Sequence, residues 1–147
     1  MDELILVIDC SGSMSTSGKI NIIGSILQTL SALNKFDDTA KNISVTRIPW
    51  DGNRESFELL SEKCSGKKTL ILTDGYAFMD NCRESQIAKK FFETDRENVF
   101  VVLCGGDAFD ISALSGFKRV PVTRSDNILF AFDSLYKSAE TEKENWK

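Results

Sequence analysis

The sequence predicts one domain of the doubly wound, Rossmann-like α/β class: a three-layer sandwich with a mostly parallel sheet of about five strands and helices on both faces. Short runs rich in Val, Ile and Leu, apolar on both faces, alternate along the chain with longer segments of helical period. The length of 147 residues suits a single domain that buries a substantial core. Such alternation implies right-handed crossovers and a parallel sheet covered on both faces.

The strands are predicted from runs that are apolar throughout, as buried parallel strands are. The runs cover residues 4–8, 43–48, 69–73, 99–104 and 119–122. The chain has no internal repeat and no low-complexity linker, so residues 1–138 are expected to form one domain. The charged segment 139–147 is expected to be a tail or the frayed end of the last helix.

Helices are predicted where apolar residues recur at a spacing of three or four. Shorter helices are expected over residues 54–63 and 82–93, with a brief one before Gly116. The first helix follows Ser17, a plausible N-cap, and its apolar stripe is Ile23, Ile26, Leu27, Leu30 and Leu33. The stripe of the last helix is Ile128, Leu129, Phe132, Leu135 and Tyr136.

Composition excludes several classes of function. A net charge of -4 and a pI near 4.9 would repel nucleic acid and anionic membranes, so neither is an expected partner. The chain contains no histidine, which excludes a Ser-His-Asp triad, a Cys-His pair and a His-ligated zinc or iron site. The start "MDELILVIDC" reads as neither a signal peptide nor a membrane span, and the four scattered cysteines read as reduced thiols. These features predict a cytoplasmic protein.

Polar side chains follow two of the predicted strands. Asp9, Ser11 and Ser13 come after the first strand, and Thr73 and Asp74 end the third. In the common strand order 2-1-3-4-5, the crevice that binds ligands lies between strands one and three, at their carboxyl ends. The two motifs are therefore expected to meet there. Their carboxylates and hydroxyls are hard oxygen donors, which suit Mg²⁺.

Asp9-x-Ser11-x-Ser13, together with Leu72-Thr73-Asp74-Gly75, resembles the metal-ion-dependent adhesion site of von Willebrand factor A domains. The resemblance implies that Ser11 and Ser13 ligate Mg²⁺ directly, with Mn²⁺ or Ca²⁺ as alternatives, and that Asp9 and Asp74 reach it through water. An Asp or Glu of a partner protein would complete the coordination shell. Intracellular members of this family often work beside AAA-type ATPases or in multi-protein assemblies.

Members of the family usually supply a third ligand, a threonine in a later loop. The segment between the second and third strands is short here, and it contains no threonine at that place. The loop "PWDGNRE" stands in its place and offers Asp51 as a substitute ligand. A solvated turn residue beside Gly52 is the alternative interpretation of Asp51. As a direct ligand, Asp51 would raise metal affinity and weaken the attraction for a partner carboxylate.

The loops around this edge carry large apolar residues, which favour a protein partner over a small substrate. The alternative is that they fold back onto the helices. The expected partner-binding residues are Met14, Trp50, Tyr76, Phe78 and Met79.

The predicted function is non-enzymatic binding of a partner protein through a magnesium site. One alternative is Mg²⁺-dependent phosphotransfer or phosphate hydrolysis with Asp9 as the nucleophile, and Lys118 near the phosphate. Another is a metal-free structural subunit of the same fold. A nucleotide-binding P-loop in "GSMSTSGKI" is rejected, because the spacer is one residue too long and Ile20 replaces the required Ser or Thr.

Overall fold

The computed structural model describes residues 2–10, 12–15, 18–36, 43–51, 57–75, 82–94, 96–108, 110–111 and 121–136. Its strands are β1 (Asp2–Asp9), β2 (Ile43–Trp50), β3 (Lys68–Thr73), β4 (Val99–Leu103) and β5 (Val122–Arg124). They form one sheet in the order β2-β1-β3-β4-β5, and every neighbouring pair is parallel. The predicted fold class and strand order are confirmed.

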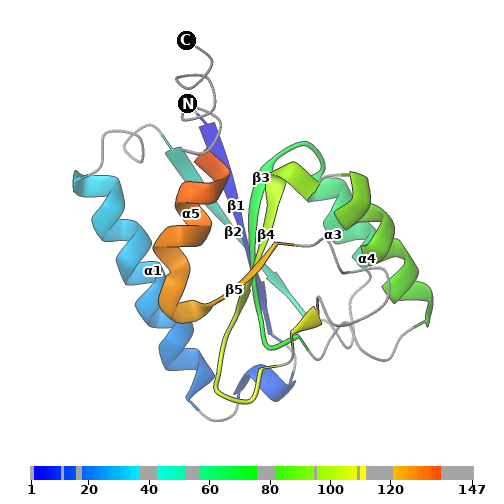
Figure 1. Ribbon diagram of the computed structural model, residues 1–147, viewed down its shortest axis with the longest axis horizontal. Coiled ribbons are helices and arrows are strands. Elements are labelled where there is room, and N and C mark those ends of the chain that lie inside the picture. The colour runs from blue at the N-terminus through cyan, green and yellow to red at the C-terminus, as the bar shows by residue number, and fades with distance from the viewer. Residues whose placement is uncertain are drawn as a thin grey trace.

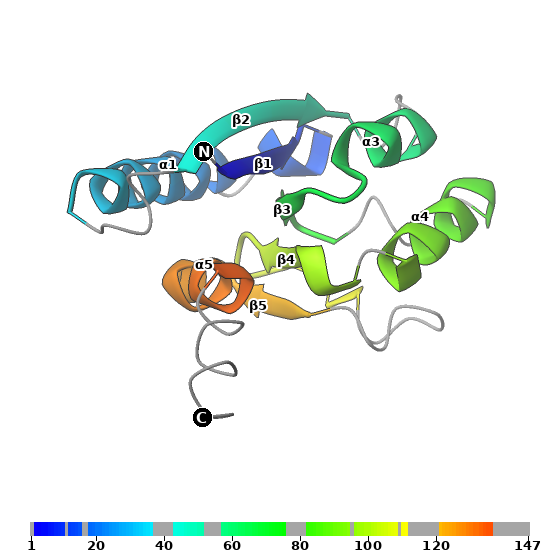
Figure 2. The same ribbon diagram turned by 90° about the horizontal axis from the view of Figure 1, so that it is seen from above.

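The helices lie on both faces of the sheet. The described helices are α1 (Lys19–Phe36), α3 (Phe57–Cys64), α4 (Cys82–Thr94) and α5 (Ile128–Tyr136). Figure 1 shows α1 and α5 covering one face while α3 and α4 cover the other, and the view from above in Figure 2 agrees. Short 3₁₀ turns cover Gly12–Ser15, Arg96–Asn98 and Ser125–Asn127.

The central strands are buried on both faces, which explains why their sequences do not alternate with polar residues. In β1, Leu4 and Leu6 belong to the hydrophobic cluster on the side of α1 and α5. Ile5 and Val7 belong to the cluster on the side of α3 and α4. Alternate residues of a strand therefore face opposite helical layers, and this alternation leads to the polar residues at the strand ends.

Some element boundaries differ from the prediction. The last described strand covers Val122–Arg124, whereas the prediction is 119–122. Residues 119–120 lie outside the described residues, as does residue 112 onward of the helix expected before Gly116. Leu129 is 48% exposed although it was expected in the buried stripe of α5. Its neighbour Phe130 is 61% exposed, so both residues lie on the solvent side of the helix, between the buried Ile128 and Ala131. No helix among the described ranges is both long and apolar enough for a membrane span.

The contrast between Leu60 and Leu59 tests the assignment of α3 to the core. Leu60 is 3% exposed and its neighbour Leu59 is 62% exposed. Leu60→Ala should lower the free energy of unfolding by roughly 2–5 kcal/mol, because it leaves a cavity against the sheet. Leu59→Ala, the matched control, should change it by less than about 0.5 kcal/mol. Urea unfolding measures both, and equal losses would contradict the packing of this helix.

Candidate functional site

Buried polar side chains gather at the carboxyl edge of the sheet. Within the described residues, the buried polar or charged side chains there are Asp9, Lys19, Thr73 and Asp74, at 1% exposure or less, and Thr69 is buried elsewhere in β3. Lysine and aspartate are almost never fully buried unless they are paired. Such a concentration at the ends of β1 and β3 marks the edge where doubly wound folds bind ligands.

Asp9 and Thr73 join the ends of β1 and β3 directly. The Thr73 hydroxyl donates a hydrogen bond of 2.7 Å to Asp9 Oδ2. The same hydroxyl accepts the backbone N–H of Gly75 at 3.1 Å. The side chain of Asp9 is therefore fixed in a water-poor position by a charge-assisted bond, which is among the stronger types of hydrogen bond.

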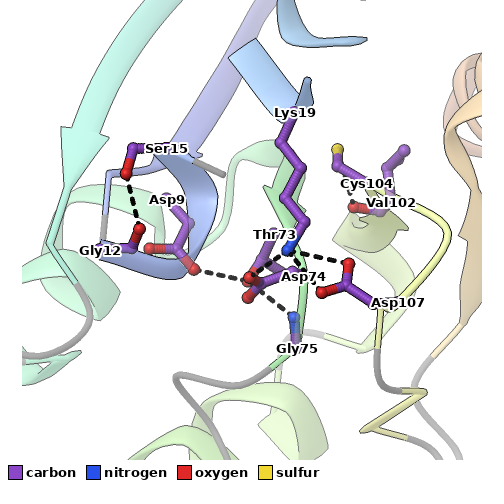
Figure 3. A network of polar contacts seen from close by, with 10 residues as sticks. All are labelled: Asp9, Gly12, Ser15, Lys19, Thr73, Asp74, Gly75, Val102, Cys104 and Asp107. Atoms are coloured by element: carbon purple, nitrogen blue, oxygen red, sulfur yellow. Dashed lines mark hydrogen bonds and ion pairs between the residues drawn. The ribbon is translucent and has the colours of Figure 1, made fainter. Parts of the chain in front are cut away.

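Asp74 faces a buried cation. Its Oδ2 accepts a hydrogen bond from the Lys19 ammonium at 3.1 Å, and both side chains are fully buried. Lys19 Nζ also lies 2.9 Å from Oδ1 and 3.2 Å from Oδ2 of Asp107, whose side chain is 54% exposed. Figure 3 shows the ammonium between the two carboxylates, with the Asp9–Thr73 bond beside them. The ion pairs connect α1, the end of β3 and the loop after β4.

The position of Lys19 is unfavourable for the helix that carries it. Lys19 is the first residue of α1, and the first turn of this helix contains no acidic residue. A helix N-terminus bears partial positive charge, so a cation there is disfavoured. Taking an ammonium out of water costs several kcal/mol more. A residue that is unfavourable both for its helix and for burial is expected mainly at a functional site. Lys19 is therefore included in the candidate site.

Gly105 makes room for the Lys19 side chain. Its φ of +102° lies in the region that favours glycine. A Cβ on this residue would stand 2.6 Å from Lys19 Cε. The glycine after β4 therefore lets the lysine stem cross the backbone and reach both carboxylates.

The charges shift the pKa values of the group. Burial acts to lower the pKa of Lys19, but its hydrogen bonds to Asp107 and Asp74 and their charges outweigh burial and raise that pKa above 10.5. The hydrogen bond from Lys19 holds the pKa of Asp107 below 3.8. Burial, with the charges of Asp74 and Asp9, raises the pKa of the Cys104 thiol to about 12. At neutral pH, Lys19 and Asp107 are charged and Cys104 is a neutral thiol.

The sequence-predicted metal ligands are only partly described. Asp9 and Asp74 both lie at the predicted edge. Thr73, which precedes Asp74 in the chain, donates its hydroxyl hydrogen bond to Asp9. Asp51 is half-buried and follows Trp50, the register partner of Asp9, so it stands at the same edge. Ser11 lies outside the described residues, and for Ser13 only the backbone is described, in the 3₁₀ turn after β1.

The predicted partner-binding rim requires a correction at two positions. Met14 and Trp50 are each 4% exposed, because Met14 packs in the cluster under α1 and Trp50 in the cluster under α3 and α4. In this structure they are core residues rather than an exposed rim. Tyr76, Phe78 and Met79 lie outside the described residues.

An apolar pocket opens beside Asp9 on the α1 side of the sheet. It has a volume of about 280 Å³ and is lined by Ile8, Asp9, Cys10, Met14, Ser15, Ile20 and Ile23. Ile20 at its rim is 66% exposed, and Cys10 is also exposed. The site thus combines a buried carboxylate with adjacent accessible apolar surface.

Comparisons with protein-family models and with curated protein sequences were made for the whole chain. No family model matches the chain, and no curated protein matches its sequence. The side chains at this edge are therefore the basis for inferring a function.

Sequence reasoning missed two members of the site, Lys19 and Asp107. In the sequence, Lys19 stands out only within the rejected P-loop pattern. A lysine at the start of a helix is disfavoured by the helix dipole, so its position beside an acidic motif indicates an ion pair. Asp107 follows a predicted strand through the pair Gly105-Gly106, and that strand ends at the same edge as β1 and β3. Its position could have been inferred from the predicted topology.

The side chains of the site include the oxygen donors that a hard divalent cation needs. The carboxylates of Asp9, Asp74 and Asp107 outnumber the Lys19 ammonium, and oxygen donors are what Mg²⁺ requires. Within the described part of the chain, which lacks Ser11 and the Ser13 side chain, no group of three or more His, Cys, Asp or Glu is placed to hold a metal. The donor types suit Mg²⁺, and an ion held at Asp74 would share that carboxylate with Lys19.

The Thr73 hydroxyl should matter for stability because it serves a buried carboxylate. Thr73→Val removes the 2.7 Å bond to Asp9 while keeping the shape of the side chain. We expect a loss of about 1.5–3 kcal/mol in the free energy of unfolding, the range for hydrogen bonds to charged groups. Thr73→Ser keeps the hydroxyl and should lose only about 1 kcal/mol, the value of one buried methyl group. A larger loss in the serine variant by urea unfolding would contradict this role.

The ion pair of Asp107 should appear in the pH dependence of stability. Because its pKa is lower in the folded protein than the ordinary 3.8, ionised Asp107 stabilises the fold. That contribution is complete above the ordinary pKa and is lost as pH falls through the folded value. Asp107→Asn should therefore be less stable than wild type at about pH 7, with the difference shrinking towards about pH 3. Urea unfolding across this range tests it, and a constant difference would oppose it.

Proposed function

We propose that the protein is a non-enzymatic protein-binding module that uses a divalent cation, Mg²⁺, at the carboxyl edge of its sheet. Asp9, Ser11, Ser13 and Asp74 would hold the cation, with Asp51 as a further candidate ligand. The observation that carries the proposal is the pair of buried carboxylates, Asp9 and Asp74, at adjacent strand ends. Carboxylates are left in such positions when a cation or hydrogen-bond donors compensate them.

The chemistry of binding follows from the ligand types. The resemblance to von Willebrand factor A domains gives the metal two neutral hydroxyl ligands, Ser11 and Ser13, and water-mediated carboxylates. A cation held in this way keeps much of its charge, and it would attract a carboxylate of a partner protein. The pocket beside Asp9 would then take an apolar side chain next to that acid. The same resemblance points to an AAA-type ATPase or a larger assembly as the source of the partner.

A metal-free scaffold is the second candidate, and one contact favours it. Lys19 already neutralises Asp74 with a fully buried ammonium. In this alternative the edge binds a partner without any ion. The phosphotransfer alternative requires Asp9 to reach a phosphate, whereas its side chain is 1% exposed and accepts a hydrogen bond from Thr73.

Calorimetric titration with Mg²⁺ and Mn²⁺ tests the cation site. Wild type should bind saturably, Ser11→Ala should lose binding, and Asp9→Asn should weaken it at least about tenfold. Ser61→Ala, which removes a hydroxyl on α3, and Glu3→Gln, which removes a charge at the start of β1, are the matched controls and should bind as wild type does. Equal binding in all variants would refute the site.

Partner capture and a phosphatase assay distinguish the metal-bridged module from the metal-free scaffold and from the phosphotransfer enzyme. Partner proteins captured in Mg²⁺ and released by a chelator, with capture lost in Ser11→Ala, would support the metal-bridged module. Capture that survives the chelator and the substitution would support the scaffold instead. Hydrolysis of p-nitrophenyl phosphate that disappears in Asp9→Asn would support the enzyme, and would contradict the proposal.

A further inference from the structure

The two carboxylates that hold Lys19 differ in exposure. Asp74 is fully buried, and it is also one of the residues assigned to the cation site. Asp107 is 54% exposed, so water can solvate its carboxylate. The Lys19 ammonium contacts both at similar distances, 3.1 Å to Asp74 and 2.9 Å to Asp107. An ammonium shared in this way can lose its contact with Asp74 and still keep a partner.

The path of the lysine stem fixes where the ammonium can go. Lys19 crosses Gly105 so closely that no Cβ fits between them. Gly105 precedes Asp107 by two residues in the loop after β4, so the stem is held beside the Asp107 carboxylate. Figure 3 shows the ammonium between the two carboxylates, so an ammonium that leaves Asp74 is still within reach of Asp107.

A divalent cation and the Lys19 ammonium cannot both use Asp74 without cost. Like charges a few ångströms apart inside a protein repel strongly, because the effective dielectric constant is far below that of water. The metal would therefore have to displace the ammonium from Asp74 or bind against its repulsion. Either route lowers the affinity for the metal.

From this geometry we infer that Lys19 is a tethered counter-ion that competes with the divalent cation for Asp74. Asp107 holds the ammonium when the metal takes Asp74, so it acts as a positioning residue for Lys19. The metal-free protein is thereby spared an uncompensated buried carboxylate. The inference rests on the proposed cation site, and it names Lys19 as the residue that lowers the affinity of this site for the divalent cation.

A purely structural role is the competing explanation. Lys19 could serve only to fasten α1 to β3 and to the loop after β4. Loss of stability in a Lys19 variant would not distinguish the two roles, because a buried charge left without its partner destabilises in either case. Metal affinity distinguishes them, since a structural clamp predicts no gain when the ammonium is removed.

The test is Mg²⁺ titration of Lys19→Met by calorimetry, with thermal unfolding measured with and without Mg²⁺. Lys19→Met should bind Mg²⁺ at least about tenfold more tightly than wild type, because removing the repulsion is worth more than the ~1.4 kcal/mol that a tenfold change represents. Mg²⁺ should also raise its melting temperature by more than it raises that of wild type. Asp107→Asn should bind Mg²⁺ more weakly, because the ammonium then has Asp74 as its remaining carboxylate in the group.

The surface pair Lys67–Glu3 supplies matched controls for both charges. These side chains are 3.0 Å apart, 50% and 41% exposed, and stand at the amino ends of β3 and β1. Lys67→Met and Glu3→Gln change the net charge as the test variants do, and both should leave Mg²⁺ affinity within about twofold of wild type, since exposed distant charges are screened. If Lys19→Met does not fold, Lys19→Gln replaces it.

The outcomes separate this inference from the proposed function. If wild type binds Mg²⁺ and the Lys19 variant binds equally or more weakly, the counter-ion role is wrong and the proposed function stands. Binding by the variant alone would support the counter-ion role and refute the metal bridge in the native protein. Absence of binding in both would overturn both. Unchanged affinity in Asp107→Asn would refute the role assigned to Asp107.

Discussion

The parallel pairing of β1 with β3 determines where Asp9, Thr73 and Asp74 stand, at one edge of the sheet. Because β1 and β3 are separated in sequence by α1, β2 and α3, their pairing requires two crossovers, and it brings Asp9 next to Thr73. The strands are buried on both faces, so a polar residue can end a strand at low cost only at the edge. The location of the site is thus a consequence of strand order.

Within that frame, one buried cation joins elements that the sheet alone would leave separate. The Lys19 ammonium links the start of α1 with Asp74 after β3 and Asp107 after β4. A buried ion pair is weak evidence for stability, because desolvation offsets much of the attraction. Its placement at a helix N-terminus adds a further penalty. Such an arrangement is better explained by a requirement of the site than by a gain in stability.

Local and topological rules were enough to predict the sheet, its order and the edge that carries Asp9 and Asp74. They failed where tertiary packing decides. Met14 and Trp50 lie next to the polar motif in sequence, but both pack into the core, and sequence proximity carries no information about that choice. Lys19 and Asp107 are far apart in the chain, and their meeting depends on a backbone glycine, Gly105, whose role emerges only in three dimensions. The resemblance to von Willebrand factor A domains offered no position for this lysine.

Thr73 and Asp74 are consecutive, yet they contact different elements of the molecule. Thr73 bonds Asp9 at the end of β1, while Asp74 meets Lys19 from α1. A single peptide bond therefore separates the two contacts. A change of the backbone at this position would disturb both the bond that joins β1 to β3 and the ion pair that holds the start of α1.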